Sequence, residues 1–247
     1  MSSRRYASWA TGPNRRADGV LACVTVGGMR SNGSMANQGL SVADVRVLAG
    51  DMSAALTTRA RERGEAALDT ETGGLDWARD PLRTIQVYVP GAWVEIIRVG
   101  ERQPAHLAKV IADPTIDKVF HYAVFDLLFL SNVLDTDIAR SVVCTKVAAK
   151  LLYPDDREAQ KLTSLTARYL GTPLDKTMRL SDWAAADLSA EQIAYAAEDV
   201  LHLPQLREAL DNELQESGLL ELARACWKHI PVRVQLERRR FGDVFSY

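Results

Sequence analysis

The sequence has few cysteines, and their spacing does not suggest a disulfide framework. Cys23, Cys144 and Cys226 are odd in number and widely separated, unlike a run of metal ligands. This usage is typical of reduced, mostly buried thiols in a cytosolic protein.

An excess of charge of either sign is also missing. The 30 basic residues against 32 acidic ones leave a net charge of −2, so bulk charge does not indicate a nucleic-acid-binding protein. A polyanionic substrate would therefore need a local basic patch or metal ions.

Long apolar runs are absent as well. No uninterrupted apolar stretch approaches the roughly 18 residues that cross a bilayer, and the N-terminus has no apolar signal core. We therefore expect a cytoplasmic protein that does not contact a membrane. Hydrophobic residues still make up 47% of the 247 residues, enough for a sizeable core.

The first 40 residues differ in composition from the rest. They are rich in Arg, Ser, Gly and Asn, with one short apolar stretch, VLACVTV. Such a composition buries too little surface to offset its ordering entropy, so we expect a flexible N-terminal extension over residues 1–40. The alternative is that translation begins at Met35.

From residue 41 the patterns are globular, with strands first and helices later. Strands are expected at EAALDTE, KVFHY and SVVCT, and TIQVYVP and GAWVEIIRVG form a hairpin around Pro90-Gly91. Beyond residue 160 every periodic segment is helical, including LSAEQIAYAAEDVLHLPQLREALDNELQES as one segment. This order predicts an α/β fold with a mixed central sheet, flanking helices and a helical C-terminal half.

Three separate segments carry acids into apolar surroundings. Asp69 and Glu71 stand two apart on a strand and share a face. Asp126 lies where a strand gives way to a helix, and Asp199 lies one helical turn after Tyr195 on an apolar face. Taken singly, these are explained as acids solvated at a turn, a helix N-cap and an Asp bonded to backbone.

Together, four carboxylates match the charge of two divalent cations. Hard oxygen ligands suit Mg²⁺ or Mn²⁺ rather than zinc. Two such ions stabilise the attacking and leaving oxygens of a phosphoryl displacement. The sequence therefore predicts a metal centre for phosphate chemistry.

The motifs LDTET, HYAVFDLLFL and YAAEDVLHL resemble, in order and separation, those of the DEDD 3′–5′ exonucleases of the RNase D type. The similarity extends from about residue 60 to 215 and includes CTKVAAKLL and SLTARYLGTPLDKTMRLSDW. Tyr195 stands four residues before the last Asp, and Ala194 occupies the place where another subclass has His. The chain thus resembles the tyrosine subclass and its RNase H-like fold.

This resemblance implies roles for the acids and the tyrosine. Asp69, Glu71, Asp126 and Asp199 would bind the two cations, and Tyr195 would position or deprotonate the attacking water. A phenol with an unperturbed pKa of about 10 is a poor base. We therefore expect Tyr195 mainly to orient the water.

A narrower resemblance is to nano-RNase C, a group that degrades very short RNA, especially dinucleotides, and assembles into a ring of eight. It rests on the short length, on SDWAAADLS and on the ending ARACWKHIPVRVQLERRRFGDVFSY. We expect an exonuclease domain over residues 41–215, with the C-terminal helix and tail, 216–247, as an oligomer contact. Val124 departs from the basic or polar residue that related sequences often have before Phe-Asp, which puts a substrate contact there in question.

The same resemblance implies a set of substrate contacts, with Leu75 wedged against a base. This set comprises Leu75, Gln86, His121, Ser181, Asp182 and Trp183. We also expect Thr70, and Lys176 as the basic residue of LDKT, to lie beside the substrate.

The expected function is a metal-dependent 3′–5′ exoribonuclease that hydrolyses short single-stranded RNA, above all dinucleotides, to nucleoside 5′-monophosphates. One alternative is an RNase D-like enzyme that trims longer RNA 3′ ends or degrades DNA. The other is a non-catalytic nucleic-acid-binding module.

Overall fold

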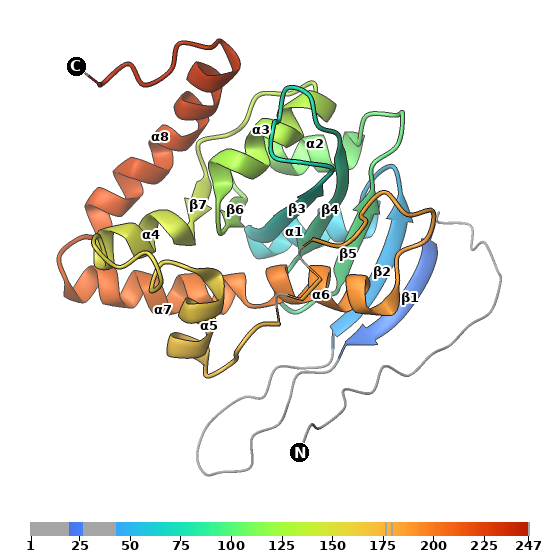
Figure 1. The fold of residues 1–247 in the computed structure, drawn as a ribbon, viewed down its shortest axis with the longest axis horizontal. Coiled ribbons are helices and arrows are strands. Elements are labelled where there is room, and N and C mark those ends of the chain that lie inside the picture. Colours follow the sequence, from blue (N-terminus) through green and yellow to red (C-terminus); the bar gives the residue numbers. More distant parts are fainter. Residues whose placement is uncertain (1–19, 27–42, 176, 179, 247) are drawn as a thin grey trace.

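A mixed seven-stranded sheet forms the centre of the computed structural model, which describes residues 20–26, 43–175, 177–178 and 180–246 (Figure 1). The strand order is β1-β2-β5-β4-β3-β6-β7. The strands are β1 (Val20–Val26), β2 (Ala43–Ala49), β3 (Glu65–Thr72), β4 (Leu82–Tyr88), β5 (Val94–Arg98), β6 (Asp117–Phe120) and β7 (Val142–Cys144).

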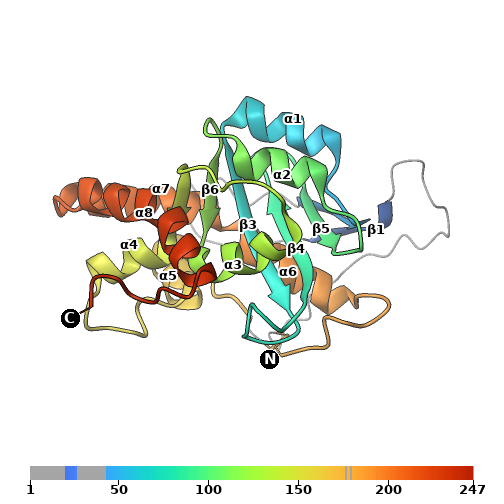
Figure 2. The ribbon, with the colours of Figure 1, turned by 90° about the horizontal axis from the view of Figure 1, so that it is seen from above.

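Helices cover both faces of this sheet, which confirms the predicted fold class. Helix α6 contacts β3, β4 and β5, whereas α1 and α2 cover the opposite face (Figure 2). Helices α4, α5, α7 and α8 pack together beside β6 and β7. The helices are α1 (Ala54–Arg63), α2 (Ala105–Ala112), α3 (Ala123–Val133), α4 (Thr145–Leu152), α5 (Leu162–Leu170), α6 (Ala190–Leu201), α7 (Leu203–Glu216) and α8 (Leu220–Arg238).

The predicted hairpin is strands β4 and β5, which pair antiparallel. Its turn is closed by a hydrogen bond from the backbone N–H of Ala92 to the carbonyl of Val89, at 2.9 Å. Pro90 and Gly91 are the two central residues, and Gly91 has a φ of 80°. A turn with proline at its first central position and a positive φ at its second central position requires glycine at the second one.

The long helical segment predicted near the C-terminus is two helices rather than one. His202 separates the two helices, as the C-cap of α6 and the N-cap of α7, and Pro204 lies in the first turn of α7. Proline lacks the N–H that would bond to the carbonyl four residues earlier, so the α6 ladder cannot continue through it. The break lets α6 cross the sheet while α7 lies against β6.

The N-terminal region also differs from expectation. VLACVTV, predicted to lie within a flexible extension, forms β1 and pairs antiparallel with β2. Its apolar residues suit the edge of an existing sheet, a partner that composition alone cannot reveal. Residues 1–19 and 27–42, including Met35, lie outside the described residues.

Two expectations from composition can be compared with the described part of the chain. Cys144 is buried and Cys226 is half-buried, both as free thiols. Among the helices of the described residues, none is both long and apolar enough to cross a membrane.

Candidate metal centre

Strand β3 brings Asp69 and Glu71 to the same face of the sheet. It pairs antiparallel with β4, so that Asp69 lies opposite Gln86 and Glu71 opposite Thr84. Alternation along a strand turns Thr70 to the other face. Both acids are half-buried, as expected where an apolar strand reaches the protein surface.

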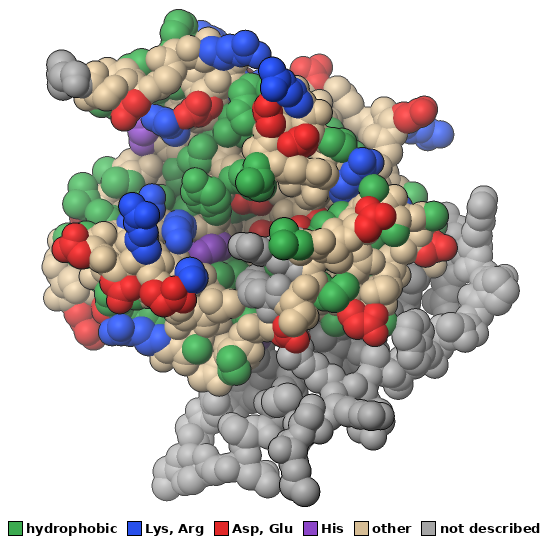
Figure 3. Space-filling model, viewed as in Figure 1, with side chains coloured by type: hydrophobic (Ala, Val, Ile, Leu, Met, Phe, Trp, Pro, Cys, Tyr) green, Lys and Arg blue, Asp and Glu red, His purple; other side chains and the backbone are tan. Residues whose placement is uncertain are grey.

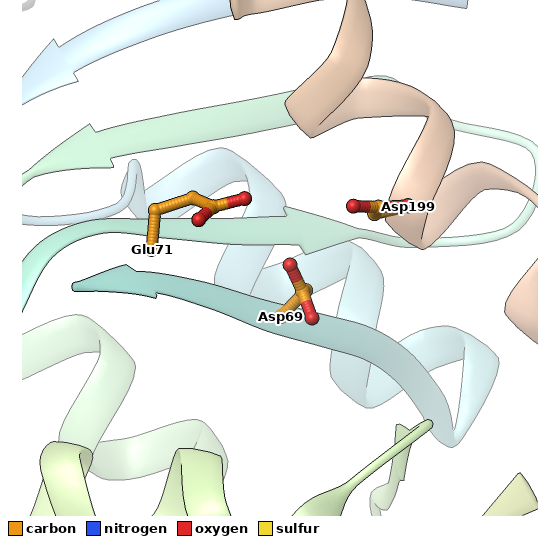
Figure 4. A group of neighbouring side chains, drawn as sticks. All are labelled: Asp69, Glu71 and Asp199. Atoms are coloured by element: carbon orange, nitrogen blue, oxygen red, sulfur yellow. The ribbon is translucent and has the colours of Figure 1, made fainter. Parts of the chain in front are cut away.

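Helix α6 supplies the third acid. Its start is fixed by a capping box, in which the Ser189 side chain accepts from the backbone of Gln192 and the Gln192 side chain accepts from the backbone of Ser189. Ala196 and Ala197 are fully buried and let the helix approach the sheet closely. Carboxylate oxygens of Asp69, Glu71 and Asp199 consequently lie within 4.8 Å of one another (Figure 4). We call these three residues the acidic cluster.

Tyr195 lies one turn before Asp199 on the buried face of α6. Its side chain is 6% exposed and packs on Trp183, with ring centroids 6.0 Å apart. Burial raises the pKa of the Tyr195 phenol, and the charges of Asp199, Glu71 and Asp69 raise this pKa further. The phenol, which hydrogen-bonds Asp199, therefore stays protonated and suits an orienting role.

Asp126 is placed differently from the other three acids. It lies in the first turn of α3 and is 3% exposed, and it does not belong to the acidic cluster. The N-cap of α3 is Tyr122, so the explanation of Asp126 as a helix cap is wrong. The hydroxyl of Thr70 donates to its Oδ1 at 2.7 Å.

The surroundings of Asp126 favour its neutral form. Burial raises the pKa of its carboxyl to about 7, opposed by hydrogen bonds from Thr70 and increased by the charge of Asp199. Asp126 is therefore close enough to the acidic cluster to sense its charge.

Several residues predicted to contact substrate lie around this site. Leu75 is 84% exposed in the loop after β3. In that loop a Cβ at Gly74 would collide with the carboxylate of Asp80, so a larger residue there would require the Asp80 side chain to move. His121 is half-buried, and its Nδ1 lies 3.0 Å from the hydroxyl of Thr145. Lys176 lies outside the described residues.

Three of the residues predicted to contact substrate are buried: Thr70, Gln86 and Trp183. Thr70 faces Asp126 from the side of the sheet opposite Asp69. Gln86 is fully buried beside Asp69 and donates to the hydroxyl of Thr84 at 2.8 Å. Sequence alone places residues on a strand but does not tell which face a helix covers.

The SDW stretch is held by α6. The side chain of Gln192 donates to the Ser181 hydroxyl at 3.1 Å and to the Asp182 carbonyl at 2.9 Å. Trp183 is 4% exposed, whereas Asp182 is exposed. This loop thus delivers Trp183 to Tyr195 and presents Asp182 to solvent.

Arg98 is a contributor that sequence reasoning missed. From the end of β5 its guanidinium donates to the carbonyls of Ala185, at 2.6 Å, and Ala186. Arg98 therefore links the sheet to the loop that contains Trp183. The sequence contains no signal for this contact, because it joins residues far apart in the chain.

Lysines gather on α4, beside the site. Burial lowers the pKa of Lys146, and the charges of Lys150 and Lys161 lower it further. The backbone N–H of Lys146 donates to the carbonyl of His121 at 3.1 Å. In Figure 3, acidic side chains lie inside a hollow whose borders include basic and hydrophobic side chains. The chain thus has a local basic patch despite its negative net charge.

Val124, the departure in the second motif, is half-buried and packs against the core. An apolar side chain fits that environment.

Residues 47–215 match the family described as 3′-5′ exonuclease. The chain belongs to this family.

Individual relatives agree with this assignment. The structure of Brucella melitensis NrnC bound to pGG is 31% identical, with a TM-score of 0.75 over 82% of this chain and 98% of that chain. Escherichia coli RNase D is 26% identical, with a TM-score of 0.64 over 73% of this chain and 48% of that one.

Ribonuclease D of Gluconacetobacter diazotrophicus is 38% identical over 118 residues, which are 47% of this chain and 29% of that protein. The chain therefore spans less than a third of the length of this curated relative.

The acidic cluster fits a divalent metal ion. Three carboxylates offering oxygens within 4.8 Å form a hard donor set of the kind that Mg²⁺ and Mn²⁺ prefer. A second structure of Brucella melitensis NrnC contains bound Mg²⁺ and is 31% identical, with a TM-score of 0.74. Asp69, Glu71 and Asp199 are the residues that would hold such an ion.

Proposed function

We propose that this protein is a metal-dependent 3′–5′ exoribonuclease that hydrolyses short single-stranded RNA, above all dinucleotides, to nucleoside 5′-monophosphates. One observation carries the proposal: three carboxylates from β3 and α6 converge within 4.8 Å, beside a buried tyrosine that hydrogen-bonds one of them. Such an arrangement suits in-line attack of water on a phosphodiester.

In this proposal Asp69, Glu71 and Asp199, together with Asp126, hold two Mg²⁺ or Mn²⁺ ions. When bound, the ions supply positive charge that stabilises the attacking and leaving oxygens. An unperturbed phenol is already a poor base near neutral pH, and burial raises the pKa of Tyr195 further. Its hydroxyl therefore orients the attacking water rather than deprotonating it.

The preference for short substrates is supported by the likeness to NrnC. NrnC is matched over 98% of its chain with a TM-score of 0.75, whereas RNase D is matched over 48% with 0.64. The exposed Leu75 suits a wedge against a base. We further propose substrate contacts by His121, Lys176, Ser181 and Asp182 at the rim of the site.

A second candidate is an RNase D-like enzyme that trims longer RNA 3′ ends or degrades DNA. The 38% identity to a Ribonuclease D favours it. Lys146 and Lys150 of α4 also favour it, because they could contact the phosphate backbone of a longer RNA. The two candidates share their chemistry and differ in how activity depends on substrate length.

The test uses 5′-labelled RNAs of two to seven nucleotides and a matched DNA set, incubated with Mn²⁺ or with EDTA. Rapid loss of the dinucleotide, with longer RNAs nearly untouched, is expected. Even shortening of every length supports the RNase D-like candidate instead. No cleavage in Mn²⁺ overturns the enzymatic proposal and leaves a nucleic-acid-binding module.

Two variants of α6 control this test. Asp199→Asn removes a ligand from the acidic cluster and should abolish cleavage. Glu191→Gln changes an exposed acid on the same helix and should leave cleavage intact. Loss of cleavage in Asp199→Asn but not in Glu191→Gln would exclude a contaminating nuclease.

We also propose that α8 and the tail after it contact further copies of the chain, up to a ring of eight. Phe241, Val244 and Phe245 are each more than half exposed, and apolar side chains gathered on one segment are typical of an interface. Light scattering during gel filtration tests this proposal, and a monomer at all concentrations would contradict it.

A further inference from the structure

Strand β3 has an edge that its neighbouring strand does not complete. The strand runs from Glu65 to Thr72, but β6 pairs with it only from Glu65 to Ala67. After β6 ends at Phe120, the chain turns into α3, which begins at Ala123. The first turn of α3 therefore comes to lie near the unpaired part of β3.

Asp126 meets β3 at this edge, and its contact there is Thr70. The Thr70 hydroxyl donates to Oδ1 of Asp126 at 2.7 Å, and the backbone N–H of Thr70 also bonds to this carboxylate. Thr70 is 7% exposed and Asp126 is 3% exposed. Water therefore has little access to replace either hydrogen bond.

Thr70 cannot reach the opposite side of the sheet. The neighbouring residues Asp69 and Glu71 direct their carboxylates to the α6 side, and alternation directs Thr70 away from them. One tripeptide thus contributes two acids on one face and, at the edge of the strand, the partner of Asp126.

We propose that Thr70 is a positioning residue for the metal centre, acting through Asp126. By holding Oδ1 with its hydroxyl, it fixes the orientation of the carboxylate and leaves Oδ2 as the oxygen for a cation. This inference rests on the proposed function, because it takes Asp126 to be the fourth metal ligand. It replaces the substrate contact expected of Thr70.

The identity of the residue agrees with this role. A β-branched side chain is favoured in a strand and has a restricted χ1, so the hydroxyl is held in place before any ion arrives. Valine has the same shape without the donor, and serine has the donor without the branch. Groups that orient a metal ligand typically change metal affinity 10- to 100-fold when they are removed.

The test measures Mn²⁺ binding to the full chain by isothermal titration calorimetry, without substrate. Thr70→Val should weaken the binding of at least one Mn²⁺ about 10-fold or more, and Thr70→Ser should stay within about threefold of the wild type. In assays with RNA, Thr70→Val should lower kcat and leave KM nearly unchanged.

A matched control and a double-mutant cycle separate positioning from packing. Thr72→Val removes the hydroxyl of another β3 threonine, one that donates to the backbone carbonyl of Gly74, and should leave Mn²⁺ affinity unchanged. In an Asp126→Asn background, Thr70→Val should cause no further loss, because both changes act through the same carboxylate. If Thr70→Val does not fold, Thr70→Ala takes its place in the cycle.

The inference is overturned if a folded Thr70→Val protein binds Mn²⁺ as the wild type does. It is also overturned if Thr70→Ser is as defective as Thr70→Val, since the cause would then be packing. A wild-type protein that binds Mn²⁺ but cleaves no RNA, with affinity lost in Thr70→Val, would overturn the proposed function and leave this inference standing.

Discussion

Strand β3 carries acids at both ends of one face, and the two ends balance their charge differently. At its start, Arg207 of α7 reaches Glu65 at 2.8 Å, Asp117 at 2.7 Å and Asp211 at 3.6 Å. We call these four residues the Arg207 cluster. At the other end lies the acidic cluster, whose third carboxylate comes from α6.

The acids of the Arg207 cluster are structural, whereas the acidic cluster is suited to catalysis. An arginine is permanently charged and occupies its carboxylates with fixed hydrogen bonds, so the Arg207 cluster joins α7 to β3 and β6. A metal ion can exchange its remaining ligands, so a carboxylate set that binds metal keeps positions for water and substrate. Helix α6 thus completes an acid set suited to binding a metal, whereas α7 places Arg207 in a fixed ion-pair network at the start of the same strand.

The largest expected effect comes from Asp199→Asn. Removing one charged ligand should lower kcat/KM at least about 1,000-fold, since a metal contributes several kcal/mol to the transition state. Cleavage of labelled dinucleotide in Mn²⁺ measures this, with circular dichroism to verify the fold. A loss of less than tenfold would place the catalytic metal elsewhere.

Tyr195→Phe should have a smaller effect at the same end of β3. Because the phenol acts by orienting water, kcat should fall about 10- to 100-fold, while Mn²⁺ affinity stays the same. Burial raises the pKa of Tyr195 above its ordinary value, so a phenol that only orients water should not titrate near neutral pH. The variant should therefore retain the shape of the wild-type pH–rate profile, and loss of an alkaline limb would instead indicate a base.

Arg207→Met tests the structural end. Its partners would remain close together without their cation, so the free energy of unfolding should fall by about 1–3 kcal/mol. This range is lower than for a fully buried pair, because the four side chains are 17–39% exposed. Urea unfolding measures it.

The activity of folded Arg207→Met protein should stay within about twofold of the wild type. A large loss of Mn²⁺ binding in this variant would mean that the two ends of β3 are coupled and that the Arg207 cluster is not purely structural.

Lys118 differs from Arg207, because this buried cation is held mainly by neutral groups. Its Nζ donates to the Asp113 carbonyl at 2.8 Å and to the Ser141 hydroxyl at 2.5 Å. Burial lowers the pKa of Lys118 from 10.5 to about 8, although the charges of Asp117 and Asp113 oppose the shift. Between these two pKa values the unfolded chain binds more protons than the folded protein.

Stability should therefore rise with pH in this window, by about 1 kcal/mol between pH 8 and 9 relative to a Lys118→Met variant. The variant provides the reference because it lacks the titrating group. Equal pH slopes for the two proteins would show that Lys118 does not titrate there.

Much of the architecture could be read from local patterns. The β4–β5 hairpin follows from Pro90-Gly91 between two apolar runs, and the pairing of Asp69 with Glu71 on one face follows from the period of a strand. The division at His202 was missed because the helical periodicity on both sides outweighed a single proline. The strand β1 was missed because the residues on both sides of it resemble a linker and its partner, β2, lies outside the segment.

The available acids and their spacing within each motif follow from residue order and from the geometry of single strands and helices. Which of the acids meet depends on the tertiary structure. It brought Asp199 to Asp69 and Glu71 through the packing of α6 on the sheet, and it placed Asp126 with Thr70 at the open edge of β3. It also paired Arg207 with Glu65 and Arg98 with the loop before α6. These contacts join residues distant in the chain, and their partners are set by sheet order and helix packing rather than by any local pattern.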